Sequence, residues 1–244
     1  MIKIHANVRK ALQHAMKMNM ILYNPADRVT LPKKIKYRAN FYSVEQVNQL
    51  LEIFKEEAMY PAVLLAAFYG FRRSEVLGLK YSHIDFNTDT LTVQDTVVRC
   101  GNVQALDKPR TKNEASHRTL PLVAPLKEFL LAEHGKQSEN MKKLGEGYVK
   151  NDYVCKWDSG EPFAPNYITC RFGKVLKKSS LPKIRFHDLR HSAASMLLKL
   201  GYSLKEIQEW LGHSTLSTTA DLYAHLEYEA KKKMASSLGD KIVF

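Results

Sequence analysis

The chain lacks an apolar run long enough to cross a membrane. Its longest apolar stretch, PAVLLAAFYGF at 61–71, is far shorter than the roughly 20 residues that a spanning helix needs, and it predicts a buried helix instead. The N-terminal MIKIHANVRKALQHAMKMN has helical periodicity but neither the continuous apolar core nor the small-residue cleavage site of a secretory signal. These absences predict a cytoplasmic protein.

Cysteine is also scarce. Cys100, Cys155 and Cys170 are odd in number, widely spread and without a CxxC pair. This pattern fits neither a disulfide framework nor a cysteine zinc site, so we expect reduced thiols. The 244 residues are 45% hydrophobic, which is enough to bury the core of an enzyme.

Positive charge is abundant and unevenly distributed. The net charge is +12, while residues 1–40 alone carry +8 and residues 171–190 carry +6, so the rest of the chain is slightly acidic. Concentrated basic segments favour a polyanionic partner, most often nucleic acid, because neutralising phosphates releases counterions. A solvated basic face that keeps the protein in solution is the simpler alternative.

The pattern along the chain predicts a boundary near residue 39. Residues 4–20 have the spacing of a helix, and the following NPADRVTLPKKIKYRAN is a linker with two prolines and no apolar periodicity. Ser43 and Gln46 then have capping-box spacing, which indicates the start of a new helix. We therefore expect the tail of a neighbouring domain at 1–38 and a second domain at 39–244.

The second domain is expected to be mainly α with a small antiparallel β-sheet, an α+β fold. Short β-type runs, HIDF, LTVQD, NVQALD and RTLPL, fall between about 84 and 122. Helices are expected near 123–134, after Pro165, from His187 to Gly201, and from a second capping box at Ser203 and Glu206.

The motif RFHDLRHSAAS at 185–195 is the first candidate for chemistry. His187 and Arg190 are three residues apart, so they share one face at the helix end that favours an anion. Arginine offers a bidentate fork to phosphate oxygens, and an imidazole can move a proton near neutral pH. The pair suits phosphate chemistry, although a capping role fits the motif equally well.

A zinc site is the rival interpretation of the same motif. His187 and His191 have the i, i+4 spacing of a helical zinc site such as HExxH. However, Asp188 stands where that motif has Glu, no third ligand is evident, and Arg185 adds positive charge. We therefore expect no metal.

Two other motifs place basic residues where they need an explanation. YGFRRSEVLGL at 69–79 puts arginines between a buried helix and an amphipathic one, where a charge requires a partner, and Glu75 can form an internal ion pair with Arg72. PRTKNEASHRTLPL at 109–122 carries Lys112 in a turn before a short strand. Taken alone, Lys112 is most simply a solvated surface charge.

Together these motifs resemble those of the tyrosine recombinases, the phage integrase family. GFRRSE, TKNEASHRTLPL, FHDLRHSAAS and LGHSTLSTTADLYAH occur in that family's order and approximate spacing, over about residues 40–230. The similarity is greatest to integrases of phages, genomic islands and conjugative transposons. It implies a catalytic domain with a C-terminal helical tail at 39–244, and it implies that 1–38 is the last helix and linker of a core-binding domain.

The resemblance also implies a set of catalytic residues. Arg72 follows GF as the family's first catalytic arginine follows GL, and Tyr223 in DLYAH matches the nucleophile. The six matching positions are Arg72, Lys112, His187, Arg190, His213 and Tyr223.

The implied reaction is transesterification without a metal or nucleotide cofactor. Arginines 72 and 190, with His213, would stabilise the pentacoordinate phosphorus while Tyr223 forms a 3′-phosphotyrosine. His187 would take the phenol proton, and Lys112 would protonate the leaving 5′-oxygen.

The implied partners are double-stranded DNA with attachment sites, other protomers in a DNA-bound tetramer, and an excisionase or DNA-bending accessory protein. Two alternatives remain: a tyrosine-type topoisomerase, and a non-catalytic DNA-binding protein of the same fold. The motif LGHSTLSTTADLYAH argues against the first, and the intact catalytic set argues against the second.

Overall fold

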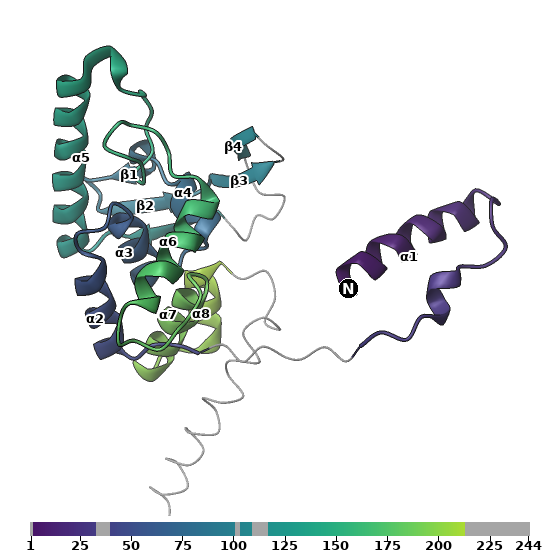
Figure 1. Cartoon of the computed structure of the whole chain (residues 1–244). Helices are drawn as coiled ribbons and strands as arrows, with labels where there is room; N and C mark the ends of the chain where they lie inside the picture. Colours follow the sequence, from purple (N-terminus) through teal and green to yellow (C-terminus); the bar gives the residue numbers. More distant parts are fainter. Residues whose placement is uncertain (1, 33–39, 101–102, 109–116, 213–244) are drawn as a thin grey trace, which may run out of the picture. The chain divides into compact units, whose positions relative to one another are not determined.

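The computed structural model describes every residue except 1, 33–39, 101–102, 109–116 and 213–244 (Figure 1). The chain divides into two compact units, Met1–Arg38 and Ala39–Phe244. In the described part of the chain, no helix has both the length and the apolar character that a membrane crossing requires.

The first unit is a helix closed by a short turn. Helix α1 (Ile2–Lys17) is followed by the 3-10 helix η1 (Pro25–Arg28), as expected for a helix and a proline-containing segment. Asn24 links the two, because its side chain accepts from the Ala26 backbone N–H and donates to the Arg9 carbonyl. Arg9 also pairs with Asp27 at 2.5 Å.

Two helices open the second unit. Helix α2 (Val44–Phe54) begins with the predicted capping box, in which Ser43 and Gln46 exchange side-chain to backbone hydrogen bonds. Helix α3 (Tyr60–Tyr69) is the buried helix that the apolar run predicts. Its packing against α2 and against a later helix, α7 (Asp188–Lys199), makes it the centre of the core.

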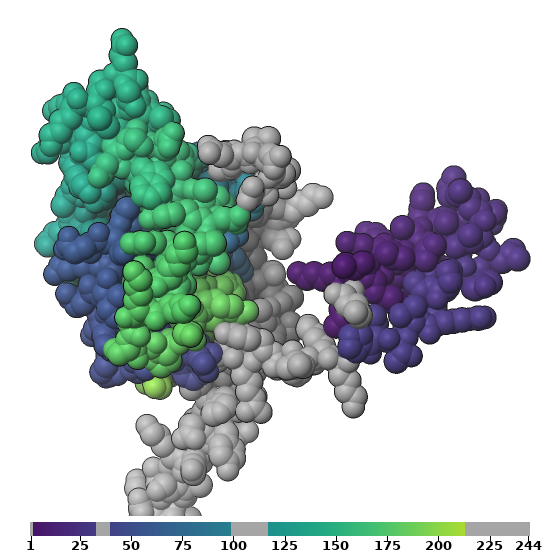
Figure 2. Space-filling model, viewed as in Figure 1, coloured from purple at the N-terminus to yellow at the C-terminus, as the bar shows by residue number. Residues whose placement is uncertain are grey.

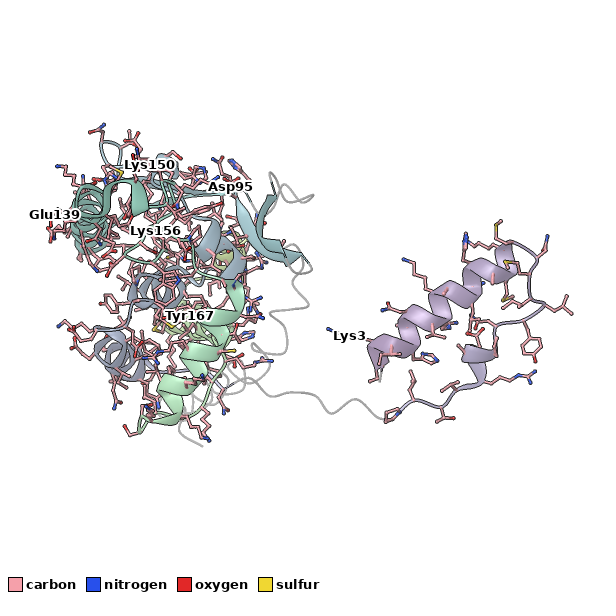
Figure 3. The ribbon with its side chains drawn as sticks, turned by 45° about the horizontal axis from the view of Figure 1, so that its top comes forward. Lys3, Asp95, Glu139, Lys150, Lys156 and Tyr167 are labelled. Carbon is pink, nitrogen blue, oxygen red and sulfur yellow. The ribbon has the colours of Figure 1, made fainter. Side chains whose placement is uncertain are left out.

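The β region contains two antiparallel sheets among the described residues, where the sequence predicts one. The first has the order β1-β2-β5, and the second is the β3-β4 hairpin. The strands are β1 (Ile84–Asp85), β2 (Thr90–Val93), β3 (Thr96–Cys100), β4 (Val103–Lys108) and β5 (Arg118–Pro121). Strand β3 was not predicted, because the run TVVRC follows LTVQD directly and only Gln94 and Asp95 separate the two strands. Asp95 is labelled in Figure 3.

Helix α4 (Arg73–Gly78) and the 3-10 helix η2 (Tyr81–His83) connect α3 to the sheets. Gly78 lies so close to the start of β3 that a Cβ atom there would lie 2.5 Å from the Asp95 carbonyl oxygen. The Asp95 carboxylate in turn accepts a 2.9 Å bond from Lys80. The base of the β3–β4 hairpin is therefore held against α4.

The remaining helices are α5 (Ala124–Leu144), η4 (Gly145–Gly147), α6 (Pro165–Lys177), α7 and α8 (Leu204–Leu211). Helix α5 runs along one side of the unit, and green α6 covers much of the face seen in Figure 2. The prediction that α5 ends near 134 is wrong. Beyond that point the helix exposes polar residues, and Gln137 fixes it by donating to the Val154 carbonyl.

The fold is mainly α with small antiparallel sheets, as predicted. One continuous core joins α2, α3, α6 and the sheet, with Phe54 stacked on Phe172 at 5.2 Å between ring centroids. Helix α8 packs on α7 and begins with the predicted Ser203–Glu206 capping box. This packing brings the end of α8 to the end of α3, where the candidate site lies.

Candidate active site

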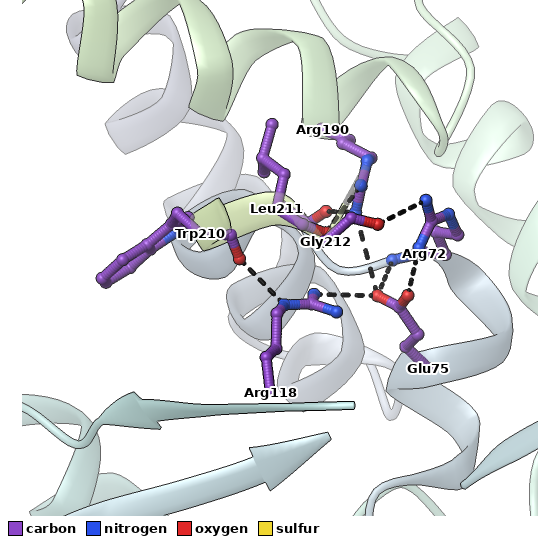
Figure 4. A network of polar contacts seen from close by, with 8 residues as sticks. Arg72, Glu75, Arg118, Arg190, Trp210, Leu211 and Gly212 are labelled. Carbon is purple, nitrogen blue, oxygen red and sulfur yellow. Dashed lines mark hydrogen bonds and ion pairs between the residues drawn. The ribbon is translucent and has the colours of Figure 1, made fainter. Parts of the chain in front are cut away.

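Three arginines from three different elements converge on the carboxylate of Glu75 (Figure 4). Nη1 of Arg72 lies 2.5 Å from Oε1, and Nη2 of Arg118 lies 3.1 Å from Oε2. Nη1 of Arg190 lies 3.8 Å from Oε2. Glu75 is 2% exposed, so one buried carboxylate faces three guanidinium groups and leaves two positive charges in excess.

Local backbone geometry places Arg72 and Glu75 together. Gly70 ends α3 in the left-handed conformation, with φ of 67°, and Arg72 directly precedes α4. Glu75 lies in the first turn of α4, where its carboxylate accepts a 2.9 Å bond from the Arg72 backbone N–H. This is the helix end at which a negative charge is stabilised.

The charges shift the pKa values of the buried groups. Burial alone would raise the pKa of Glu75, but the charges of Arg118, Arg72 and Arg190 outweigh it and hold the pKa below the ordinary value. Burial and the charge of Arg72 lower the pKa of Arg190 to about 9, which still leaves its guanidinium protonated at neutral pH. The cluster is thus cationic, although it contains a carboxylate.

The same three arginines bind the C-terminal end of α8. Three successive backbone carbonyls there each accept a hydrogen bond from a different arginine, although the last carbonyls of a helix have no partner within the helix. The pairs are Arg118 Nε to Trp210 O at 2.8 Å, Arg190 Nη2 to Leu211 O at 2.6 Å, and Arg72 Nη2 to Gly212 O at 2.9 Å. The negative end of the helix dipole therefore lies on the cationic cluster.

His187 precedes α7 and is exposed, whereas Arg190, in the first turn of that helix, is buried. Desolvation, followed by the charges of His191 and Arg190, lowers the pKa of His187 below 6.5. Because the ring is exposed, water screens part of this pKa shift. The shift is still downward, so the imidazole is neutral at pH 7. A neutral imidazole can accept a proton.

Asp188 fixes the backbone that carries this motif. Its buried carboxylate accepts from the Arg185 backbone N–H at 2.8 Å and pairs with the Arg185 guanidinium at 2.8 Å. Ser192 donates to the Asp188 carbonyl and accepts from the Tyr42 backbone N–H, which ties the start of α7 to the segment before α2. In the sequence, Asp188 is notable only as a mismatch to a zinc motif, so its structural role is not evident there.

The structure brings together two of the six predicted catalytic residues, Arg72 and Arg190, and puts His187 in the turn that leads to Arg190. The Arg72–Glu75 ion pair is confirmed. Lys112, His213 and Tyr223 lie outside the described residues, and their roles stay predictions.

Arg118 was missed. A signal for it was present in the run RTLPL, where strand periodicity puts Arg118 on the same face as Leu120. That face is buried in β5. A buried arginine in a strand requires a counter-charge, which Glu75 provides.

The cluster is suited to bind a polyanion and to stabilise charge that develops on one. Among the residues that the structure describes, no three histidine, cysteine or carboxylate side chains are arranged to hold a metal ion. Cys155 is buried, Cys170 is exposed on α6, and both are free thiols.

Comparison with known proteins gives a family match over residues 40–230, to the model described as the phage integrase family. A tyrosine recombinase XerC-like protein of Caldanaerobacter subterraneus subsp. tengcongensis is 30% identical over 226 residues, which cover 88% of this chain and 57% of that protein. The ICEBs1 integrase of Bacillus subtilis is 26% identical over 97% of this chain and 64% of its own length. The chain therefore spans less than two thirds of either relative.

Solved structures share the fold. The Tn1549 transposon integrase, solved in complex with transposon right end DNA, superposes with a TM-score of 0.76 at 19% identity, over 96% of this chain and 78% of that one. A lambda integrase dimer bound to a COC′ core site gives a TM-score of 0.59 at 19% identity, over 90% of this chain and 57% of that one.

Proposed function

The chain belongs to the phage integrase family, and we propose that it is a site-specific DNA recombinase that cleaves and rejoins DNA through a covalent 3′-phosphotyrosine. The observation that carries this proposal is the convergence of Arg72 and Arg190 at Glu75, next to the end of α8. From there the chain continues directly into the segment that holds His213 and Tyr223.

The arginines supply what a metal-free phosphoryl transfer needs. A phosphodiester is protected by its negative charge, and the attack of a nucleophile concentrates more charge on the non-bridging oxygens. Glu75 and the backbone carbonyls already hold the guanidinium groups in place. Little free energy is therefore spent on rearranging them when that charge appears. Arg72 is a third exposed at its side chain, so it can reach a phosphate at the surface.

The remaining steps are assigned to the other matched residues. Tyr223 attacks in line, His213 adds a donor to the phosphate, and His187 accepts the phenol proton. The lowered pKa of His187 supports this role, because only the neutral ring can accept. Lys112 protonates the 5′-oxygen as it leaves, which an arginine does poorly because its pKa lies above about 12.

The proposed partners are those that the family resemblance implies. Double-stranded DNA with attachment sites is the substrate, other protomers complete a DNA-bound tetramer, and an excisionase or DNA-bending protein directs the outcome. Residues 1–38 are the last helix and linker of a core-binding domain. The Tn1549 and lambda integrases were solved on DNA, which supports the DNA part of this proposal by analogy.

Strand exchange is favoured over simple relaxation of supercoils. The relatives described above carry the names of recombinases and integrases, one of them from the element ICEBs1. A non-catalytic DNA-binding protein is disfavoured because all six positions of the catalytic set keep the residue type that the chemistry needs.

The proposal is tested with a pool of nicked DNA duplexes whose sequence around the nick is randomised. We expect a protein–DNA adduct that survives SDS, and sequencing of the recovered adducts gives a cleavable site for later measurements. Tyr223→Phe should abolish the adduct and still shift DNA on a native gel. An adduct that survives this substitution excludes Tyr223 as the nucleophile, and no adduct with the unmodified chain rejects the function.

A further inference from the structure

We propose that Arg118 is a positioning residue, which couples the arginines of the active site to the two chain segments that carry Lys112, His213 and Tyr223. The proposal rests on the recombinase function above. Its basis is that one guanidinium donates in two directions, from Nε to the Trp210 carbonyl at 2.8 Å and from Nη2 to Oε2 of Glu75 at 3.1 Å.

The two bonds of Arg118 connect parts of the chain that lie close in sequence to Lys112 and to His213. Arg118 is the first residue of β5 and lies six positions after Lys112, so it anchors the strand that follows the lysine segment. Trp210 lies three positions before His213. A single side chain therefore links a residue near the described end of each segment to the carboxylate that also holds Arg72.

Arg118 is itself held in place. Strand β5 pairs with β2, where Arg118 is opposite Val93. The residue is 9% exposed, and its guanidinium carbon lies 5.3 Å from the centre of the Phe71 ring. Because packing, strand register and two hydrogen bonds restrict its motion, Arg118 can transmit position from the sheet to the end of α8.

A buried guanidinium that already binds the protein in two directions is poorly placed to contact DNA. Loss of Arg118 should therefore slow the chemical step rather than weaken DNA binding. A misplacement of about 1 Å in catalytic groups costs on the order of 10²-fold in rate, and this is the size of effect that we expect. The salt dependence of binding should stay unchanged, since it counts phosphate contacts.

The test compares Arg118→Met and Arg118→Lys with the unmodified chain on the cleavable site. Methionine removes the guanidinium donors at similar length, whereas lysine keeps the charge but offers one nitrogen in place of the planar fork. Lys127→Met is the matched control, because Lys127 also pairs with a carboxylate, that of Asp89, at 2.6 Å and lies on α5, outside the basic segments 1–40 and 171–190. Single-turnover adduct formation, DNA affinity against salt, and thermal unfolding are measured for each variant.

Trp210 supplies a readout that needs no DNA. The chain has two tryptophans, so Trp157→Phe leaves Trp210 as the only indole, and its emission reports on the end of α8. In that background Arg118→Met should shift the Trp210 emission and Lys127→Met should not. If Arg118→Met fails to fold, Arg118→Lys takes its place in every comparison.

We expect Arg118→Met to lose about 10²-fold in cleavage rate with unchanged affinity and salt slope, Arg118→Lys to recover part of that loss, and Lys127→Met to match the unmodified chain. Cleavage at the normal rate in both Arg118 variants overturns the positioning role while leaving the recombinase function intact. A reduced salt slope also overturns it, because Arg118 would then bind phosphate directly. Failure of the unmodified chain to form any adduct overturns the function and this proposal with it.

Discussion

The guanidinium of Arg72 donates a 2.9 Å hydrogen bond to the carbonyl of Gly212, a residue 140 positions further along the chain. Its other terminal nitrogen pairs with Glu75. Arg72 thus joins the start of α4 to the end of α8. A phosphate that binds Arg72 therefore contacts a guanidinium group whose orientation is already fixed by Glu75 and by the Gly212 carbonyl.

Arg72→Lys should therefore separate charge from geometry. Lysine keeps the positive charge but cannot bridge Glu75 and Gly212 with a planar fork. We expect DNA affinity within about threefold of the unmodified chain and a cleavage rate lower by about 10²–10³-fold, the usual cost of removing a donor from a developing oxyanion. Arg73→Lys is the control, since Arg73 binds only Thr169 among the partners identified for its side chain. Equal losses in both variants would contradict a specific role for Arg72.

Glu75→Gln should destabilise the fold. The substitution removes the carboxylate that pairs with all three arginines, and two of these arginines are buried. Removal of one partner from a buried ion pair costs about 3–5 kcal/mol. Urea unfolding measures this loss, and added phosphate should restore more stability to Glu75→Gln than to the unmodified chain. An unchanged unfolding midpoint would show that the arginines do not depend on Glu75.

Local features of this fold could be predicted from the sequence, and long-range ones could not. The capping boxes at Ser43 and Ser203 were found because both partners lie within four consecutive residues. Arg118 contacts Glu75 and Trp210 across 43 and 92 positions, and no pattern along the chain encodes such pairs. Strand periodicity could have identified Arg118 as inward-facing but not what it contacts.

In the candidate site, too, local motifs could be predicted from the sequence and long-range contacts could not. Arg72, His187 and Arg190 were found by motif, and the structure adds what motifs cannot give, namely the shared carboxylate and the carbonyls of α8. Strand β3 is hard to predict because the two residues Gln94 and Asp95 are a weak boundary between two β-type runs. The roles of Lys112, His213 and Tyr223 rest on sequence resemblance alone.

The pKa of His187 gives a pH prediction. Because the pKa of the folded state lies below 6.5, the unfolded chain binds more protons than the folded one as the pH falls from 6.5 toward the folded pKa. His187 therefore lowers the free energy of unfolding as the pH falls from 6.5 toward its folded-state pKa, and it has no such effect at higher pH. NMR of the ring nitrogens should show a neutral His187 at pH 6.

His191→Gln provides the matching control. The charge of His191 contributes to the lowered pKa of His187, so its removal should raise the His187 pKa toward 6.5. His134 lies in α5 and packs beside Tyr81, so His134→Gln should leave the pKa of His187 unchanged. A His187 midpoint at or above 6.5 in the unmodified chain would remove the argument for this residue as the proton acceptor.

Gly70 allows the approach of α3 to α8 to be tested without touching a charged group. A Cβ atom at Gly70 would lie 2.4 Å from Cδ2 of Leu211, and the φ of 67° is unfavourable for any side chain. The left-handed conformation alone costs roughly 1–2 kcal/mol for alanine, so Gly70→Ala should lower the unfolding free energy by at least about that amount. Because Leu211 must move to admit the methyl group, and its carbonyl binds Arg190, the cleavage rate should fall as well.

The control is Gly173→Ala in α6, where a Cβ atom would meet nothing within 4 Å. A helical glycine replaced by alanine gains stability by about 0.5–1 kcal/mol, the opposite sign to Gly70→Ala. Urea unfolding of the two variants measures both signs in one experiment. Gly70→Ala could instead be as stable and as active as the unmodified chain. The end of α8 could then move away from α3 without disturbing Arg190, and the inference that α8 is tightly coupled to the arginine cluster would be wrong.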